Sequence, residues 1–211
     1  MKRVINLDNW NRKEHFKFFS ALDDPFWGIT TTVDFTSIYQ QSKNMEVSFF
    51  LYSVHFLLKC INATTAFKLR IENGEVVEYD KINIAPTSRR EDGTFGFGFF
   101  EYDTDLSLFI ENAEKEIHRV KNSTGLSFSK DTARADVIRY SALPWFAFSE
   151  MKHAGSIQTG DSIPKISTGK LIQEKKKLLL PISISVHHGL VDGRNVAEFI
   201  QNVKDGQNNT L

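Results

Sequence analysis

Apolar residues recur along the chain with two different spacings, and together these spacings predict a mixed α/β fold. A spacing of three to four residues predicts helices over residues 13–22, 48–63 and 105–121, with a last helix beginning at Arg194. Alternating or short apolar runs predict strands at 27–35, 67–71, 76–79, 82–85, 94–102, 137–140, 145–149, 165–172 and 178–186. We therefore expect an α/β fold of two layers, a mixed sheet with helices packed on it, in a single domain over residues 1–211.

Polar stretches between the predicted strands mark the turns. Asn73-Gly74, between the strands at 67–71 and 76–79, is a strong signal for a two-residue hairpin. The charged run at 174–177, Glu-Lys-Lys-Lys, is expected to be a solvated hairpin, with a phosphate-binding patch as the alternative.

Charge and cysteine content limit the partners of the protein. The 26 Lys and Arg residues balance the 26 Asp and Glu residues, so no overall field favours nucleic acid or an anionic membrane. The N-terminus has no apolar core typical of a signal peptide, and no apolar run approaches the length of a membrane span. We expect a cytoplasmic protein without a nucleic-acid or membrane partner. The single cysteine, Cys60, lies in an apolar helical run and is expected to pack as a small hydrophobe.

The run 186–193, Val-His-His-Gly-Leu-Val-Asp-Gly, is the strongest chemical signal in the chain. Alternating Ile and Ser residues before it predict a half-buried strand, and Gly189 and Gly193 allow a sharp turn into the last helix. Neighbouring strand residues point to opposite faces, so we expect one of His187 and His188 to face the chemistry and the other to pack. An imidazole titrates near neutrality and can take and return a proton, which makes this turn a candidate site for general base catalysis.

Metal binding is the competing explanation for His187, His188 and Asp192, because both residue types coordinate first-row metals. A structural zinc site takes four ligands, whereas Cys60 lies in an apolar helix and the remaining histidines are scattered without ligand spacing. We therefore expect no metal.

Two motifs at opposite ends of the chain resemble chloramphenicol acetyltransferases, the trimeric members of the coenzyme A-dependent acyltransferase superfamily. The first is His-x-x-x-Asp-Gly at 188–193, and the second is Trp-Asn-Arg-Lys-Glu-His-Phe at 10–16. Shorter matches at 62–63, 73–80, 144–145 and 169–170 follow in the family's order. Dihydrolipoyl acyltransferases, peptide-synthetase condensation domains and plant acyltransferases share His-x-x-x-Asp-Gly, but the length and context of this chain fit the free-standing acetyltransferases. The resemblance implies a chloramphenicol acetyltransferase-like fold over essentially the whole chain.

The resemblance implies direct transfer of an acetyl group from acetyl-CoA to a hydroxyl of chloramphenicol or of a similar small molecule. His188 is the implied general base, with its tautomer held by its own backbone carbonyl. Asp192 is implied to form a structural ion pair with Arg12, and Ser167 to hold a water near the oxyanion. The implied assembly is a homotrimer with active sites between subunits, in which His188 faces the neighbour's acceptor pocket.

This chain departs from the family pattern at two positions. Ala147 stands where the pattern Pro-Trp-x-Ser places the hydroxyl that stabilises the oxyanion, a loss worth about 3 kcal/mol in the transition state. Ser149 is too far along the predicted strand to replace it, so we expect a water or a substrate group there; the alternative is a catalytically impaired member that binds CoA or sequesters a ligand. Lys170 matches a lysine at the coenzyme's 3′-phosphate, but Ser48 replaces the second lysine, which predicts weaker acetyl-CoA binding.

The acceptor pocket is predicted from aromatic residues alone. Phe95 aligns with an aromatic residue that lines the family's chloramphenicol site, and Phe26 and Trp27 lie where further apolar contacts are expected. The chain has 18 phenylalanines, so core packing is the alternative for each of these side chains.

Overall fold

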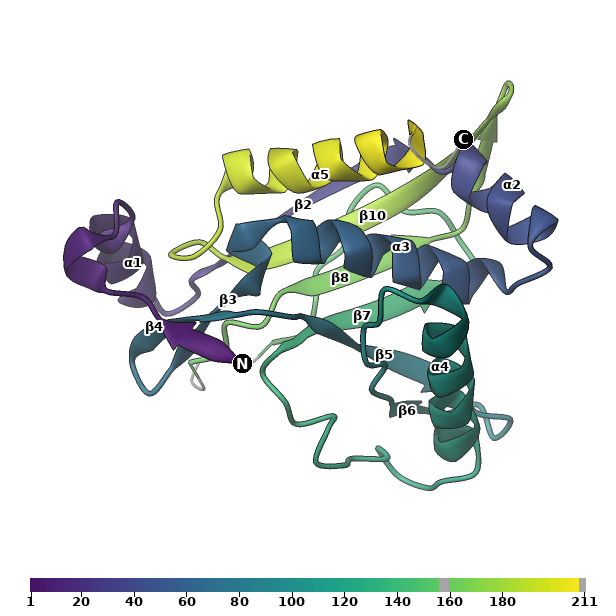
Figure 1. Ribbon diagram of the computed structural model, residues 1–211, viewed down its shortest axis with the longest axis horizontal. Helices are drawn as coiled ribbons and strands as arrows, with labels where there is room; N and C mark the ends of the chain where they lie inside the picture. Colours follow the sequence, from purple (N-terminus) through teal and green to yellow (C-terminus); the bar gives the residue numbers. More distant parts are fainter. Residues whose placement is uncertain (156–159, 209–211) are drawn as a thin grey trace.

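The computed structural model describes residues 1–155 and 160–208, and within them a seven-stranded mixed sheet forms the centre of the fold (Figure 1). In sheet order its strands are β2 (Phe26–Asp34), β10 (Lys177–His187), β8 (Lys165–Gly169), β7 (Val137–Leu143), β5 (Asn83–Arg89) and β6 (Phe95–Phe97), while β9 (Ile172–Glu174) also pairs with β10. Strand β7 runs parallel to β5 and β8, and the remaining pairs are antiparallel. The predicted mixed sheet is confirmed.

A smaller sheet joins the start of the chain to the predicted hairpin. Its three strands are β1 (Lys2–Val4), β4 (Glu75–Tyr79) and β3 (Leu69–Glu72). Asn73 and Gly74 turn between β3 and β4 with φ values of 51° and 81°, the positive angles that a two-residue hairpin turn of this type requires. The hairpin prediction is confirmed, whereas β1 is too short and too polar to be recognised in the sequence.

Helices form the second layer, as expected. In Figure 1, α3 (Phe49–Ala63) and α5 (Gly193–Asn208) lie across one face of the large sheet. The other helices are α1 (Lys13–Ser20), α2 (Thr36–Asn44), α4 (Leu106–Lys121) and the short 3-10 helices η1 (Leu7–Asn9) and η2 (Thr65–Lys68). Asp105 begins α4 by accepting hydrogen bonds from the Ser107 and Leu108 amides. Helix α2 was not predicted, because its polar sequence carries a weak apolar pattern.

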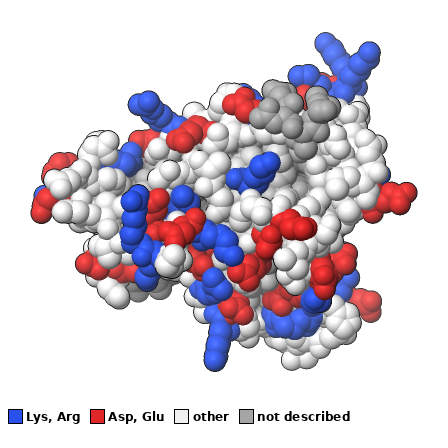
Figure 2. All heavy atoms as spheres, viewed as in Figure 1, with Lys and Arg blue, Asp and Glu red and all other residues white. Residues whose placement is uncertain are grey.

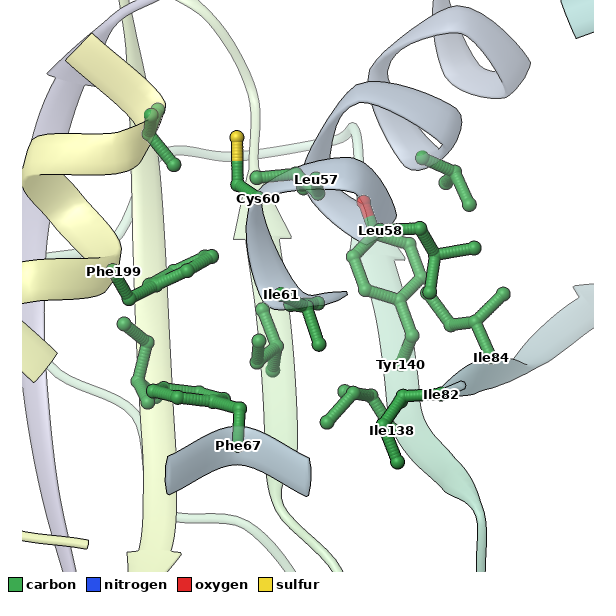
Figure 3. Close-up of a cluster of buried hydrophobic side chains, with 14 of the residues drawn as sticks. Leu57, Leu58, Cys60, Ile61, Phe67, Ile82, Ile84, Ile138, Tyr140 and Phe199 are labelled. Atoms are coloured by element: carbon green, nitrogen blue, oxygen red, sulfur yellow. The ribbon is translucent and has the colours of Figure 1, made fainter. Parts of the chain in front are cut away.

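The main core lies between the large sheet and helices α3 and α5 (Figure 3). Apolar side chains of α3 face the sheet strands, and Phe199 of α5 packs 4.9 Å from Phe67 between ring centroids. Cys60 is only 4% exposed within this cluster, and burial raises the pKa of its thiol to about 12. The predicted packing role of Cys60 is confirmed, because a thiol with so high a pKa stays protonated.

Three predicted strands differ from the structure. Residues 145–149 form no strand, so that prediction is wrong: β7 ends at Leu143, and Pro144 has no amide hydrogen to continue the ladder. The strand expected at 94–102 shortens to β6, and the one expected at 165–172 divides into β8 and β9. The alternation of apolar residues alone did not reveal these breaks.

Positively and negatively charged side chains are interspersed on the surface. Lys and Arg side chains lie among Asp and Glu side chains over the face shown in Figure 2, as the balanced composition leads one to expect. No helix in the described ranges has the length and apolar character needed to cross a membrane.

Candidate active site

His188 follows the last residue of β10, where that strand meets the first residues of β2. Its backbone amide donates to the Pro25 carbonyl at 2.8 Å, which fixes the chain at the start of the turn. The partly buried imidazole stacks on Phe19 with 4.0 Å between ring centroids and 21° between ring planes. Trp27 packs on it at 5.3 Å and 39°. Two aromatic side chains therefore hold the His188 ring in one orientation.

The two ring nitrogens of His188 have different surroundings. Nδ1 is buried and has no hydrogen-bond partner in the part of the chain that the structure describes. The His188 backbone carbonyl accepts a hydrogen bond from Arg12 at 3.2 Å. The hydrogen bond from Nδ1 to this carbonyl that the resemblance implies is therefore absent among the described residues, and the carbonyl is bonded to Arg12 instead. Because Nδ1 is withdrawn from solvent, Nε2 is the nitrogen through which the ring can exchange a proton with a substrate.

His187 is the packing member of the pair. It is 3% exposed, meets the Phe26 ring edge-on at 5.9 Å, and accepts a hydrogen bond from the Gly189 amide at Nδ1, 3.1 Å away. Burial lowers the pKa of His187 to about 4, so the ring is neutral at pH 7 with its proton on Nε2. A side chain at Gly189 would be crowded, because a Cβ there would lie 3.0 Å from His187 Cε1 and 3.2 Å from Phe16 Cα.

Arg12 and Asp192 form an ion pair that joins the start of α1 to the turn after β10. Asp192 also caps α5, since its Oδ1 accepts from the Arg194 amide at 2.9 Å and the Asn195 amide at 3.1 Å. Burial alone would raise the pKa of Asp192, but the hydrogen bonds from Arg12 and from the two amides lower it overall. Arg12 therefore holds both Asp192 and the His188 carbonyl in place.

A row of hydroxyls crosses the sheet at Ser167. The β10 and β8 register pairs Ser183 with Ser167, and the β7 and β8 register pairs Ser167 with Ser141. The residues that flank these serines along their strands belong to the core, so the hydroxyls lie on the opposite face of the sheet from α3. Thr87 extends the row, with its Oγ1 3.3 Å from Ser141 Oγ. Neighbouring strands lie about 4.8 Å apart, so one small group can contact two of these hydroxyls.

Sequence reasoning missed two residues beside Ser167. Ser141 was overlooked because its place next to Ser167 depends on the register of β7 against β8, which the sequence does not reveal. His153 was treated as scattered, yet its Nε2 lies 3.0 Å from Ser167 Oγ. It reaches Ser167 from the irregular segment after β7, for which no periodic pattern gives a position.

Ala147 lies in the exposed segment 145–149, beside the end of β8. The Lys170 amide donates to the Phe146 carbonyl at 2.9 Å, and a Cβ on Gly169 would lie 3.0 Å from the Phe148 ring. Ala147 thus lies near Ser167 in the fold but on no strand. The distance between Ala147 and Ser149 that the sequence predicted assumed a strand at 145–149, so that estimate does not apply.

The two predicted coenzyme residues are both exposed. Lys170 follows the last residue of β8 with its side chain in solvent. Ser48 occupies the N-cap of α3, but its side chain makes no capping hydrogen bond. The positive end of the α3 dipole and the Ser48 hydroxyl are therefore both available to an anion.

The predicted acceptor residues lie at opposite edges of the large sheet. Phe26 and Trp27 are on β2, where Trp27 Nε1 donates to the Val191 carbonyl at 3.0 Å and Lys165 Nζ lies 4.0 Å above the Phe26 ring. Phe95 is on β6 and is 49% exposed. A single chain does not bring these three side chains into one pocket.

His188 and Ser167 are also separated within one chain. Ser167 pairs with Ser183, which precedes His188 by five residues on β10, and at about 3.3 Å per residue the two sites are roughly 16 Å apart. The chain therefore presents two half-sites, one at the end of β10 and one around Ser167. Among residues 1–155 and 160–208, no three His, Cys, Asp or Glu side chains gather into a set that could hold a metal ion.

Comparison with known proteins relates these features to a family. The family model described as chloramphenicol acetyltransferase matches residues 2–204. Chloramphenicol acetyltransferase 3 of Escherichia coli is 27% identical over 208 residues, which cover 98% of this chain and 97% of that protein. A chloramphenicol acetyltransferase of Clostridioides difficile is 27% identical over 205 residues, which cover 95% of this chain and 93% of that protein.

Solved structures agree with the sequence matches. A chloramphenicol acetyltransferase structure gives a TM-score of 0.89 at 29% identity and covers 98% of this chain and 99% of that one. A probable dihydrolipoamide acetyltransferase from Listeria monocytogenes shares the fold, with a TM-score of 0.69 at 12% identity over 99% of this chain and 94% of that one. The chain thus belongs to the chloramphenicol acetyltransferase family and is an acyltransferase.

Proposed function

We propose that this protein transfers an acetyl group from acetyl-CoA to a hydroxyl of chloramphenicol or of a similar hydroxylated small molecule. The observation that carries the proposal is the imidazole of His188, held between Phe19 and Trp27 at the end of β10 with Nδ1 buried. An imidazole held in a fixed orientation suits a general base. The family uses acetyl-CoA as its acyl donor.

His188 Nε2 takes the proton of the acceptor hydroxyl as the hydroxyl oxygen attacks the thioester carbonyl. The carbonyl oxygen becomes an oxyanion, which collapses as the carbon–sulfur bond breaks, and the proton passes from His188 to the departing coenzyme A thiolate. The products are the acetyl ester and free coenzyme A. Contacts with Phe19 and Trp27 hold the His188 ring in one orientation before the acceptor binds, so the ring loses less orientational freedom on binding.

Ser141 supplies the oxyanion donor in this proposal. It lies next to Ser167 across the β7 and β8 register, so the two hydroxyls can reach the same oxygen or a water between them. The donor expected at Ala147 is then unnecessary. Removing a donor of this kind costs about a hundredfold or more in rate, so Ser141→Ala should show that loss, and Ala147→Ser should leave the rate within a few-fold of native.

The competing proposal is a catalytically impaired family member that binds CoA or sequesters a ligand, based on Ala147. It predicts no thiol release from the native chain with acetyl-CoA and chloramphenicol, and release after Ala147→Ser. Active native protein that loses activity on Ser141→Ala supports the transferase.

We place the working site between subunits of a homotrimer. The separation of roughly 16 Å between His188 and Ser167 within one chain supports this, since a second copy can supply the missing half. Refolding a mixture of His188→Ala and Ser167→Ala chains should restore activity through hybrid sites in which both residues are intact. A stable monomer by mass in solution would contradict the shared site.

Acetyl-CoA is expected to bind with its 3′-phosphate near Lys170. The Lys170 side chain is exposed, and the N-terminus of α3 at Ser48 offers a second site for phosphate. A cytoplasmic location stays a prediction.

A further inference from the structure

The face of the sheet that carries the hydroxyl row is covered by the segment 150–155. Met151 O lies 3.5 Å from Ser183 Oγ, and a Cβ on Gly155 would lie 3.2 Å from Lys165 Nζ. Between these two contacts, His153 Nε2 reaches Ser167 Oγ at 3.0 Å. The segment thus closes over Ser167, which is completely buried.

The surroundings of His153 keep its ring neutral. Burial, together with the positive charge of Lys165, lowers the pKa of His153. A neutral imidazole carries one proton, so the 3.0 Å contact is either a donation from Nε2 to Ser167 Oγ or a donation from the Ser167 hydroxyl to Nε2. Only the first arrangement leaves the Ser167 proton free for a third group.

We propose that His153 is a positioning residue that donates from Nε2 to Ser167 Oγ and so directs the hydroxyl proton of this buried serine toward Ser141, its partly exposed partner on the neighbouring strand. The inference rests on the proposed role of Ser167 in the acetyl transfer. A serine hydroxyl rotates about one bond, and with its oxygen engaged by His153 the remaining direction for its proton is away from His153. Ser141 is the register partner of Ser167 on the neighbouring strand.

The competing explanation is that His153 only satisfies a buried hydroxyl. A role confined to packing would affect stability and leave the chemical step alone once the protein is folded. A positioning role affects kcat, spares substrate binding, and disappears when Ser167 has no hydroxyl. These differences define the experiment.

The experiment measures acetyl-CoA-dependent thiol release with chloramphenicol for native protein, His153→Phe, His153→Gln, Ser167→Ala and the double variant His153→Phe/Ser167→Ala. Gln places an amide donor near the position of Nε2, whereas Phe keeps the ring and removes the donor. We expect His153→Phe to lower kcat roughly tenfold, less than the hundredfold that loss of a donor itself causes, with both KM values within about twofold. His153→Gln should recover most of kcat, and His153→Phe should cost nothing further in the Ser167→Ala background.

His118→Phe is the matched control, because His118 is a histidine on α4 outside the proposed machinery, and its kcat should equal native. If His153→Phe does not fold, His153→Ala takes its place, since truncation at this half-buried position removes atoms without adding any. Unchanged kcat in a folded His153 variant, or losses that multiply in the double variant, would overturn the positioning role alone. Unchanged kcat in Ser167→Ala would overturn the role of Ser167 on which the inference rests. A native protein that releases no thiol with chloramphenicol would contradict the proposed transfer to this acceptor.

Discussion

The ion pair between Arg12 and Asp192 gives a prediction whose size can be worked from the structure. Arg12→Met removes the charge and keeps an unbranched side chain of similar length. The variant loses the bond to Asp192 and the 3.2 Å hydrogen bond to the His188 carbonyl. Hydrogen bonds to charged groups contribute about 1.5–3 kcal/mol each.

Two features make the expected loss of stability smaller than the sum of these two hydrogen-bond contributions. The Asp192 side chain is 35% exposed, so water solvates it when Arg12 is gone, and its bonds to two α5 amides persist. Arg12 Nε is buried without a hydrogen-bond partner among the described residues, which already costs the native state some stability. We therefore expect Arg12→Met to lower the free energy of unfolding by about 2 kcal/mol, or Tm by roughly 4–8 °C in a chain of this size.

Thermal unfolding with a matched control tests this value. Arg3 pairs with Glu78 at 2.7 Å, but its side chain is 73% exposed, so Arg3→Met should cost less than about 1 kcal/mol. Arg12→Lys keeps the charge but cannot bridge both acceptors in the same way, and should fall between native and Arg12→Met. Equal Tm losses for Arg12→Met and Arg3→Met would refute the reasoning.

The same pair predicts a pH dependence with a definite sign. The pKa of folded Asp192 is lowered, so the stability it contributes is fully present above the unfolded value near 3.9 and is lost as pH falls through the lower folded pKa. The Tm difference between native and Arg12→Met should therefore be constant from neutrality to about pH 5 and shrink at lower pH. A difference that grows on acidification would contradict this account.

Three further changes have expected outcomes of their own. Phe19→Leu removes the ring stacked on His188, worth about 0.5–1.5 kcal/mol, so kcat should fall roughly two- to tenfold; an unchanged kcat would mean that the stacking does not orient the base. Ser48→Lys should lower the Kd for acetyl-CoA, and equal Kd values for the variant and native protein would contradict the predicted phosphate contact. Gly189→Ala forces a Cβ to within 3.2 Å of the Phe16 backbone and should lower stability by about 1–3 kcal/mol in thermal unfolding; native-like stability would show that the turn tolerates a side chain.

The sequence revealed the parts of the site that are close together along the chain. His188, Asp192 and the turn glycines form one short motif, and the Trp-to-Phe run at the N-terminus supplied Arg12 as a partner for Asp192. Periodicity also found β10 and α5, since each has a long regular apolar pattern.

Contacts that depend on strand register or on irregular backbone could not be read in this way. Ser141 meets Ser167 because β7 pairs with β8 in one parallel register among several that the apolar pattern allows. His153 reaches Ser167 from a segment without secondary structure. The strand wrongly expected at 145–149 has the same origin: an apolar run looks alike whether it pairs with a strand or lies exposed beside one.

Acetyl-CoA-dependent thiol release with chloramphenicol, measured side by side for native protein, His188→Ala and His188→Gln, tests the central claim most directly. A general base contributes about a hundredfold to ten-thousandfold, so both variants should lose at least a hundredfold in kcat while remaining folded in thermal unfolding. Gln occupies similar space but cannot take up the hydroxyl proton, which separates loss of the base from loss of packing. If His188→Ala or His188→Gln turned over chloramphenicol at the native rate, the result would contradict the account.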